Sequence, residues 1–376
     1  MTQAPIRHLY VHLPFCASRC GYCDFVTLAG RARQHDAYVD GLLAELELRR
    51  HLLAPELETV FLGGGTPTFT EPAALERLLA ELPPAAEVTV EANPETVTRA
   101  LATLLRGSGV DRVSLGAQSF QPRLLSVLSR VARPGDVRRA FYHLRDAGFD
   151  NISLDLIYGI PGQSASALED DIAEALRLAP EHLSCYELEA KPRTRFAHAH
   201  GAELVRQEEA LEGYFERVVE LLVAAGYRWY ETANFCRRPE LARGRDLRSR
   251  HNLAYWRARD YLGLGIGAVS TVAGHRWRTT PRLAAYLLAL ADGELPERDL
   301  ELLSPDVRRE ERLLLGLRLD EPLPLSPLAD GRDLAALERL ERLGLARVAG
   351  EPDAETLTLT SRGRLLGGGV TAELLA

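Results

Sequence analysis

The stretch that decides the fold reads Tyr10-Val-His-Leu-Pro-Phe-Cys16-Ala-Ser-Arg-Cys20-Gly-Tyr22-Cys23-Asp-Phe25. Its three cysteines fall within eight residues. A loop this short cannot spread its sulfurs over a tetrahedron, and a structural zinc ion would need a fourth ligand nearby. Three thiolates from one loop suit an iron–sulfur cube better, and such a cube leaves one iron open to a small chelating molecule. A zinc site or a redox-active disulfide is the alternative interpretation.

The CxxxCxxC spacing, with Tyr22 before the third cysteine, resembles the signature of radical S-adenosylmethionine (radical SAM) proteins. In that family the amine and the carboxylate of S-adenosylmethionine chelate the open iron. The resemblance implies that Cys16, Cys20 and Cys23 ligate one 4Fe-4S cluster. It also assigns Tyr10 and Tyr22 to the surroundings of the bound S-adenosylmethionine.

Composition limits the remaining possibilities. The 376 residues, 46% of them hydrophobic, suffice for a large domain and a smaller one. A formal charge of -8 argues against a protein that binds nucleic acid by broad phosphate neutralisation. Five cysteines, three of them clustered, do not form a disulfide framework, and the first residues lack a signal peptide's apolar run. We therefore expect a cytoplasmic protein that reaches a membrane only through a partner.

Short apolar runs alternate with helical segments in the first half of the chain. Six strand-like runs cover residues 8–15, 59–62, 87–91, 112–115, 152–157 and 183–188. Segments such as 38–53 lie between them, with apolar residues at helical spacing. This alternation predicts an α/β fold with a parallel sheet, whose reactive groups gather at the carboxyl ends of the strands. The radical SAM resemblance implies a partial (β/α)6 barrel.

Glycines and polar residues stand at those carboxyl ends. The run Gly63-Gly64-Gly65-Thr66 removes every Cβ from a strand end, so that a ligand can approach the backbone. By resemblance, Gly64, Gly65 and Thr66 receive the methionyl amine of S-adenosylmethionine. A simple turn is the alternative.

The other candidates for the S-adenosylmethionine site follow later strands. By resemblance, Glu91 accepts hydrogen bonds from the ribose hydroxyls and Arg130 faces the cofactor carboxylate. Asp155 interrupts an apolar strand, where an ionisable group needs a partner or a purpose. The resemblance completes the set with Gln118, Asp155, Glu189 and Val269. A solvated carboxylate and a surface arginine are the alternatives for Glu91 and Arg130.

The next part of the chain breaks this repeat. We expect a helix over 203–225, an aromatic strand over 227–235 and a glycine-rich strand over 262–269. A basic loop, Arg237 to Arg250, is either a solvated turn or faces the carboxylates of a porphyrin. It leads into His251-Asn252-Leu-Ala-Tyr255-Trp256.

The HNxxYW element resembles the HemW-type haem chaperones, which are grouped with the oxygen-independent coproporphyrinogen III oxidases. The matching motifs cover residues 8–270. The resemblance implies a haem ligand: a neutral His251 is a competent axial ligand, and Tyr255 and Trp256 could pack on the macrocycle. A hydrogen-bonded core histidine is the alternative.

Residues 301–376 lose the alternation. Helices over 308–317 and 334–343, followed by strands over 346–348 and 356–360, predict a small α+β, winged-helix-like domain. Without a basic recognition face we expect it to pack on the barrel or on a partner rather than on DNA. The predicted domains are thus a barrel with the cluster loop (1–200), a HemW-type extension (201–300) and the winged-helix-like domain (301–376).

Two features favour a haem chaperone over a decarboxylase. The decarboxylases carry an extra cysteine where this chain has Phe25, and they begin with a long extension, whereas here Tyr10 comes almost at once. We therefore predict a protein that binds a 4Fe-4S cluster, S-adenosylmethionine and haem, and that passes haem to an unidentified acceptor protein. A coproporphyrinogen III oxidase and a noncatalytic zinc module are the alternatives.

Overall fold

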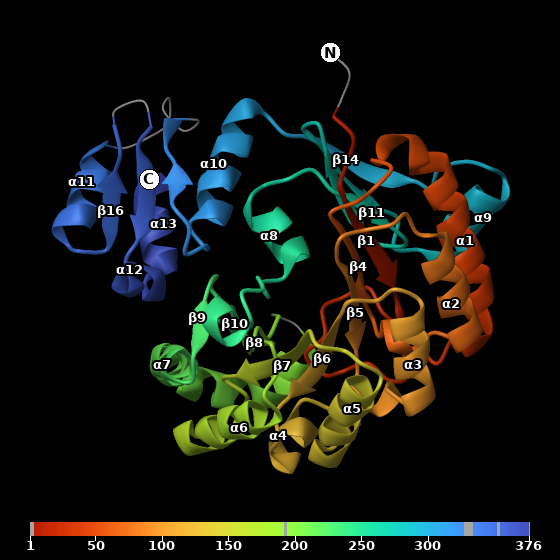
Figure 1. Ribbon diagram of the computed structural model, residues 1–376, viewed down its shortest axis with the longest axis horizontal. Helices are drawn as coiled ribbons and strands as arrows, with labels where there is room; N and C mark the ends of the chain where they lie inside the picture. The colour runs from red at the N-terminus through yellow and green to blue at the C-terminus, as the bar shows by residue number, and fades with distance from the viewer. Residues whose placement is uncertain (1–3, 192–193, 327–333, 352–353, 376) are drawn as a thin grey trace.

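A computed structural model of the chain describes residues 4–191, 194–326, 334–351 and 354–375. Its main feature is a curved nine-stranded sheet in the order β11-β1-β4-β5-β6-β7-β8-β10-β9 (Figure 1). The six central strands are β1 (His8–Leu13), β4 (Thr59–Gly64), β5 (Val88–Ala92), β6 (Arg112–Gln118), β7 (Ile152–Tyr158) and β8 (His182–Glu187). They run parallel to one another, so the predicted α/β fold with a parallel sheet is confirmed.

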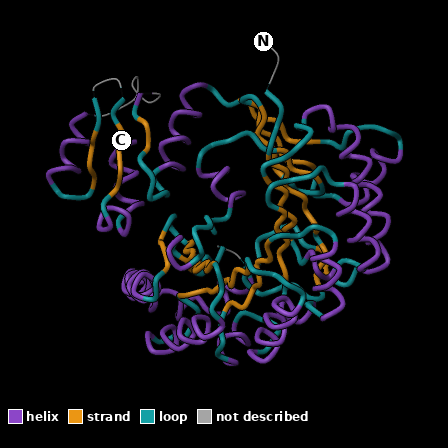
Figure 2. The backbone as a smooth tube through the Cα atoms, in the orientation of Figure 1, coloured by secondary structure: helices purple, strands orange, loops and turns teal. Residues whose placement is uncertain are grey.

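Helices cover the convex side of this sheet (Figure 2). They are α1 (His35–Arg49), α2 (Pro72–Glu81), α3 (Arg99–Gly107), α4 (Pro122–Val127), α5 (Pro134–Asp146), α6 (Ala165–Leu178) and α7 (Arg195–Ala224). Side chains alternate along each strand, so that Leu9, Val11 and Leu13 of β1 belong to the buried apolar core. The other face of β1 carries His8, Tyr10 and the buried His12. The apolar core therefore lies between sheet and helices, while the concave side is lined with polar groups.

Several elements of the extension differ from their predicted bounds. Helix α7 begins at Arg195 rather than at residue 203, because the Thr194 side chain accepts a hydrogen bond from the Ala197 amide and caps the helix there. The expected strand over 227–235 is a hairpin of β9 (Tyr227–Trp229) and β10 (Asn234–Arg237). β10 pairs antiparallel with β8, and β9 pairs antiparallel with β10 at the edge of the sheet.

The expected strand over 262–269 is also two strands. β11 (Leu262–Leu264) pairs in parallel with β1, whereas β12 (Val269–Val272) belongs to a separate sheet with β13 (His275–Thr279) and β14 (Arg298–Leu302). The chain turns between them at Gly265, whose φ of +100° is a conformation that suits glycine.

Helix α8 (Arg250–Trp256) carries the HNxxYW element and lies on the concave side of the sheet (Figure 1). The Arg250 amide donates to Glu87, which precedes β5, and His251 bonds Thr59 at the start of β4. Helix α8 therefore sits at the amino ends of the strands. Helix α9 (Leu283–Ala291) packs on α1 on the outer side, where Tyr286 donates to the buried Glu45.

The C-terminal elements have a hydrophobic core of their own, which includes Leu340, Leu357 and Val370. They are α10 (Pro305–Gly316), β15 (Leu323–Pro324), α11 (Leu334–Arg342), β16 (Ala346–Ala349), β17 (Thr356–Leu359), α12 (Ser361–Leu365) and α13 (Gly367–Leu375). The predicted helices and strands lie within a few residues of α10, α11, β16 and β17, and α12 and α13 follow them. The winged-helix assignment and the three domain boundaries stay predictions.

Contacts between charged and aromatic groups join these C-terminal elements to the barrel. Asp320 accepts two hydrogen bonds from Arg228, at 2.7 and 2.9 Å. The Arg364 guanidinium lies 3.7 Å from the centre of the Trp229 ring. No helix within the described residues combines the length and the apolar character that crossing a membrane requires.

Candidate functional site

The cluster loop, residues 16–23, follows the carboxyl end of β1. Cys16 ends the short strand β2 (Phe15–Cys16), which pairs with β3 (Leu28–Ala29) and closes the loop. Cys20 and Cys23 lie on the loop between them, and the Cys23 amide donates to the Cys20 carbonyl. The remaining cysteines, Cys185 and Cys236, are buried in β8 and β10.

Two of the three loop sulfurs accept hydrogen bonds from other parts of the barrel. The Thr66 hydroxyl lies 3.5 Å from Cys16 Sγ, and Arg130 Nη1 lies 3.6 Å from Cys20 Sγ. Asn93 connects the two donors, because its Nδ2 donates to Thr66 Oγ1 at 3.0 Å and its Oδ1 accepts from Arg130 Nη2 at 2.9 Å. One network therefore joins the ends of β4 and β5 and the turn after α4 to the cysteine loop, as outer-shell partners of a metal centre do.

These residues fit an iron–sulfur cluster. Burial raises the pKa of the Cys16 and Cys23 thiols, a cost that bound iron offsets because a cation favours the thiolate. Within the described part of the chain, no three histidine, cysteine or acidic side chains surround a single ion position. A 4Fe-4S cube does not need three side chains around one ion, because each cysteine binds a different iron. The donors beside Cys16 and Cys20 suit thiolate acceptors.

The glycine turn at the end of β4 contacts the cluster loop. Gly64 has a φ of +110°, and a Cβ there would lie 2.4 Å from the His12 ring. The amides of Gly65 and Thr66 donate to the carbonyls of Leu13 and Phe15, which binds the turn to the cluster loop. A Cβ at Gly65 would lie 2.6 Å from the Pro14 carbonyl, so only glycine permits this close approach of two backbones.

Two carboxyl groups lie on the concave side of the sheet next to this turn. Glu91 accepts a hydrogen bond from the Gly64 amide at 3.1 Å, and the Ser114 hydroxyl lies 3.0 and 3.1 Å from the two oxygens of Asp155. Burial, with the charge of Asp155, raises the pKa of Glu91 to about 7. Burial also raises the pKa of Asp155. Hydroxyl donors of a ligand would stabilise the ionised form of either group.

Gln118 and Arg130 complete this end of the barrel. Gln118 has a φ of +64°, unusual for a residue with a side chain, at a register shift between β6 and β7. Arg130 also donates to the Gly116 carbonyl at 2.8 Å. Burial alone would lower the pKa of Arg130, but Tyr22 and Cys20 beside it raise that pKa overall. The cation is therefore retained next to the cysteine loop.

The remaining residues predicted for the S-adenosylmethionine site are Tyr22, Tyr10, Val269 and Glu189. Tyr22 lies beside Arg130 and packs against Phe196 of α7, with ring centres 6.5 Å apart. Tyr10 and Val269 line a separate cavity of about 220 Å³ beside Phe25. Glu189 is exposed and forms an ion pair with Lys191 at 2.6 Å, so the structure does not bring it to the buried carboxyl groups.

Sequence reasoning missed His12 and Asn93. His12 Nε2 lies 2.9 Å from the Val26 carbonyl, which only accepts, so Nε2 carries the proton and Nδ1 accepts from the Tyr10 hydroxyl. Burial lowers the pKa of His12 to about 4, which keeps the ring neutral. His12 lies two positions from Tyr10 on the same face of β1, and Asn93 lies two positions from Glu91, just after the end of β5. This spacing is the signal that could have found them.

The residues predicted to bind haem lie at the opposite, amino end of the strands. His251 is buried, with Nδ1 2.8 Å from the Thr59 hydroxyl and Nε2 2.9 Å from the Tyr255 hydroxyl. Burial lowers its pKa to about 3. Both ring nitrogens are thus engaged within the protein, and the role of His251 as an axial ligand stays a prediction. Tyr255 and Trp256 reach the surface of a cavity.

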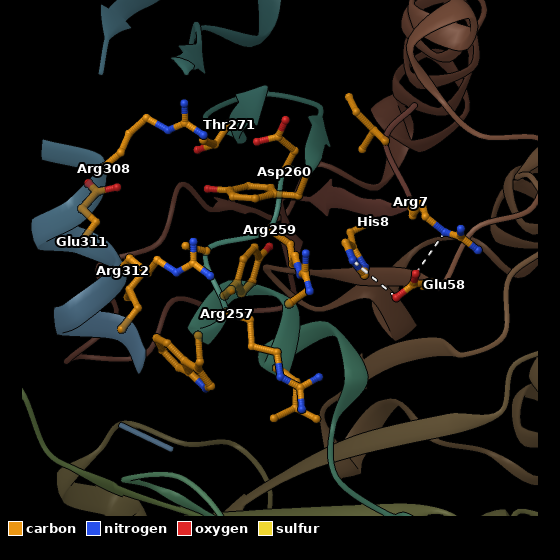
Figure 3. Close-up of a pocket in the computed structure, with 18 of the residues that line it drawn as sticks. Arg7, His8, Glu58, Arg257, Arg259, Asp260, Thr271, Arg308, Glu311 and Arg312 are labelled. Atoms are coloured by element: carbon orange, nitrogen blue, oxygen red, sulfur yellow. Dashed lines mark ion pairs between the residues drawn. The ribbon is translucent and has the colours of Figure 1, made fainter. Parts of the chain in front are cut away.

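That cavity has a volume of about 1500 Å³ and lies between α8, α10 and the starts of β1 and β4 (Figure 3). Its lining includes His8, Tyr255, Trp256, Arg259, Arg308 and Arg312. A cationic and aromatic wall of this kind suits a large planar ligand that carries carboxylates.

Known proteins resemble this chain over nearly its whole length. Residues 10–175 match the model of the radical SAM superfamily. The heme chaperone HemW of Mycobacterium tuberculosis is 37% identical over 381 residues, which cover 98% of this chain and 94% of that protein. The chain belongs to the HemW family of heme chaperones. HemW of Bacillus subtilis is 33% identical over 384 residues, 98% of this chain and 99% of that protein.

HemW of Escherichia coli is 37% identical over 291 residues, which cover 74% of this chain and 75% of that protein. The predicted membership, a HemW-type haem chaperone on a radical SAM scaffold, is confirmed. Among solved structures, coproporphyrinogen III oxidase (HemN) from Escherichia coli superimposes with a TM-score of 0.79 at 23% identity, over 99% of this chain and 90% of that one. This likeness shows the fold. Radical SAM membership implies a 4Fe-4S cluster and S-adenosylmethionine.

Proposed function

We propose that this protein binds one 4Fe-4S cluster, S-adenosylmethionine and haem, and hands the haem to an acceptor protein. The observation that carries the proposal is the position of two sites at opposite ends of one barrel. The cysteine loop and the buried carboxyl groups lie at the carboxyl ends of the strands, and the cavity beside Tyr255 and Trp256 lies at their amino ends.

At the carboxyl ends, Cys16, Cys20 and Cys23 would hold the cluster. The cluster, when bound, supplies an open iron for the amine and carboxylate of S-adenosylmethionine. Arg130 would balance the negative charge that gathers beside it. Glu91 and Asp155 would accept hydrogen bonds from hydroxyl groups of the cofactor.

The distance between the cysteine loop and the cavity favours a tetrapyrrole that is carried as a ligand over one that reacts as a substrate. The six residues of β1 from His8 to Leu13 span on the order of 16 Å. Aromatic rings fill the interval, because Phe61 stacks on Tyr10 and on His251 at 6.2 and 5.1 Å between ring centres. Hydrogen abstraction needs reacting atoms within about 3 to 3.5 Å. A tetrapyrrole in the cavity is therefore separated from chemistry at the cysteine loop.

A cytoplasmic location and the absence of nucleic-acid contacts complete the proposal, and they rest on the acidic charge and the cysteine usage of the chain. Association with a membrane would depend on the acceptor protein.

The alternative function, oxidative decarboxylation of coproporphyrinogen III, is tested by a turnover assay. Cluster-loaded protein is incubated with coproporphyrinogen III, S-adenosylmethionine and a reductant without oxygen, and protoporphyrinogen IX is measured. We expect no conversion. Steady multiple turnover by a preparation that fails to bind haem would establish the oxidase instead.

A further inference from the structure

The cavity at the amino ends contains one histidine whose outer nitrogen has no close partner. His8 lies in the lining near Arg7 and Arg259 (Figure 3), and Tyr255 belongs to the same lining. Its Nδ1 is 3.0 Å from the Thr59 hydroxyl, while its Nε2 has only the carboxylate of Glu58, at 3.7 Å. The Glu58 side chain is 52% exposed and also pairs with Arg7, so it can leave His8 without uncovering a buried charge.

One hydroxyl group joins this histidine to the HNxxYW element. Thr59 Oγ1 lies between Nδ1 of His8 and Nδ1 of His251, and His251 Nε2 bonds the Tyr255 hydroxyl. A threonine hydroxyl has a single hydrogen, so it donates to one imidazole and accepts from the other. The tautomers of the two histidines are therefore complementary.

This coupling decides whether Nε2 of His8 carries a hydrogen or a lone pair. If Thr59 donates to His251, it must accept from Nδ1–H of His8, and Nε2 of His8, a residue of the cavity lining, then carries a lone pair. His251 in that arrangement donates its own Nε2–H to Tyr255. Metal-bound histidines are oriented by the same kind of hydrogen bond from the second ring nitrogen.

The opposite wall of the cavity supplies positive charge. Arg308 and Arg312 stand one turn apart on α10 and point into the cavity (Figure 3). Within the described residues no acidic side chain pairs with either, whereas the neighbouring Arg276 is held by two hydrogen bonds to Glu311. Two unpaired guanidinium groups across from an imidazole match a macrocycle with a central metal and carboxylates at one edge.

We propose that Nε2 of His8 binds the iron of haem in this cavity, that Arg308 and Arg312 pair with its propionates, and that Thr59 and His251 are positioning residues. The proposal rests on the proposed haem binding, and it names the site. It differs from axial ligation by His251, because it gives that buried ring the task of fixing the tautomer of His8.

The test is a haem titration of the full, cluster-loaded chain, followed by the Soret band and by EPR of the ferric complex. His8→Ala and His8→Gln should each weaken haem binding at least tenfold and change the spectrum. Added imidazole should restore the wild-type spectrum of His8→Ala. His275→Ala, which removes an exposed histidine of β13, should change nothing. Far-UV circular dichroism confirms that each variant is folded.

Two further variants test the supporting residues. Thr59→Val should leave iron coordinated but alter the EPR signal, since it removes the hydrogen bonds of Thr59 Oγ1 to His8 and His251 and leaves Nε2 of His8 in place. The Arg308→Gln, Arg312→Gln double variant should bind haem about tenfold more weakly and haem dimethyl ester unchanged.

These outcomes distinguish a failure of the proposed function from a failure of the assignment of His8. If wild-type protein binds no haem, the proposed function fails. If wild-type protein binds haem but folded His8→Ala and His8→Gln bind it with the wild-type spectrum and affinity, the assignment of His8 is overturned and the proposed function stands.

Discussion

The guanidinium of Arg130 lies 3.6 Å from the sulfur of Cys20, although 110 residues separate them in the sequence. The same side chain bonds Asn93 and the Gly116 carbonyl, so its position is set by the barrel and not by the loop. A cationic donor at a thiolate ligand is one of the means by which a protein adjusts an iron–sulfur cluster.

Removing this cation should lower the reduction potential of the cluster. In Arg130→Ala the reduced cluster loses the positive charge that stabilises the added electron, so a redox titration followed by EPR should give a more negative midpoint. Thr66→Val, which removes the neutral donor to Cys16, should have a smaller effect. Equal midpoints for Arg130→Ala and wild-type protein would show that Arg130 has no such role.

The cluster ligands are tested by matched cysteine variants. Cys16→Ala should abolish the visible absorbance of anaerobically reconstituted protein, since a corner of the cube loses its ligand. Cys185→Ala and Cys236→Ala should retain it, because both thiols are buried in strands of the sheet. Loss of the cluster in Cys185→Ala but not in Cys16→Ala would end the assignment.

The carboxyl groups of the concave side should contribute to binding of S-adenosylmethionine. Glu91→Ala and Asp155→Ala should each weaken binding by about 1 to 3 kcal/mol, measured by calorimetry on cluster-loaded protein, because ligand hydroxyls lose their acceptors. Glu76→Ala, at an exposed position of α2, is the control. Glu189→Ala should matter less than Glu91→Ala, since Glu189 is exposed. Unchanged affinity in both Glu91→Ala and Asp155→Ala would place the cofactor elsewhere.

The raised pKa of Glu91 predicts a pH dependence of stability in the protein without cofactors. An ordinary glutamate has a pKa of 4.5, against about 7 in the fold, so between these values the folded state binds more protons than the unfolded chain. Stability should therefore fall as pH rises through this window.

Glu91→Gln removes this contribution. Relative to wild-type protein, the variant should gain up to about 3 kcal/mol of unfolding free energy between about pH 4 and about pH 8, measured by urea denaturation. Parallel pH profiles of the two proteins would show that Glu91 titrates normally.

The strands and the cysteine loop could be predicted because their signals are local. The apolar run predicted over 152–157 is β7 (Ile152–Tyr158), and the glycine turn ends β4 as expected. Alternating polarity also indicates the two-sided sheet, since His8, Tyr10 and His12 share one face of β1. Asp155 could be singled out because a carboxyl group in an apolar strand is costly without a partner, and Glu91 because it stands at the carboxyl end of a strand.

The site at the amino ends could not be predicted in this way. His251 and Thr59 are 192 residues apart, and nothing near either residue indicates that one hydroxyl joins two imidazoles. The resemblance of the HNxxYW element predicts that His251 is an axial ligand of haem, whereas the fold buries its ring. The start of α7 was misplaced because Gly201 weakens the helical pattern, while Thr194 caps the helix earlier.

The most direct test of the account is an equilibrium titration of cluster-loaded protein with haem, monitored at the Soret band. The account predicts a saturable change that ends at about one haem per chain, since the cavity holds a single imidazole that can reach iron. A linear response without saturation, the same as that of haem added to buffer, would contradict it.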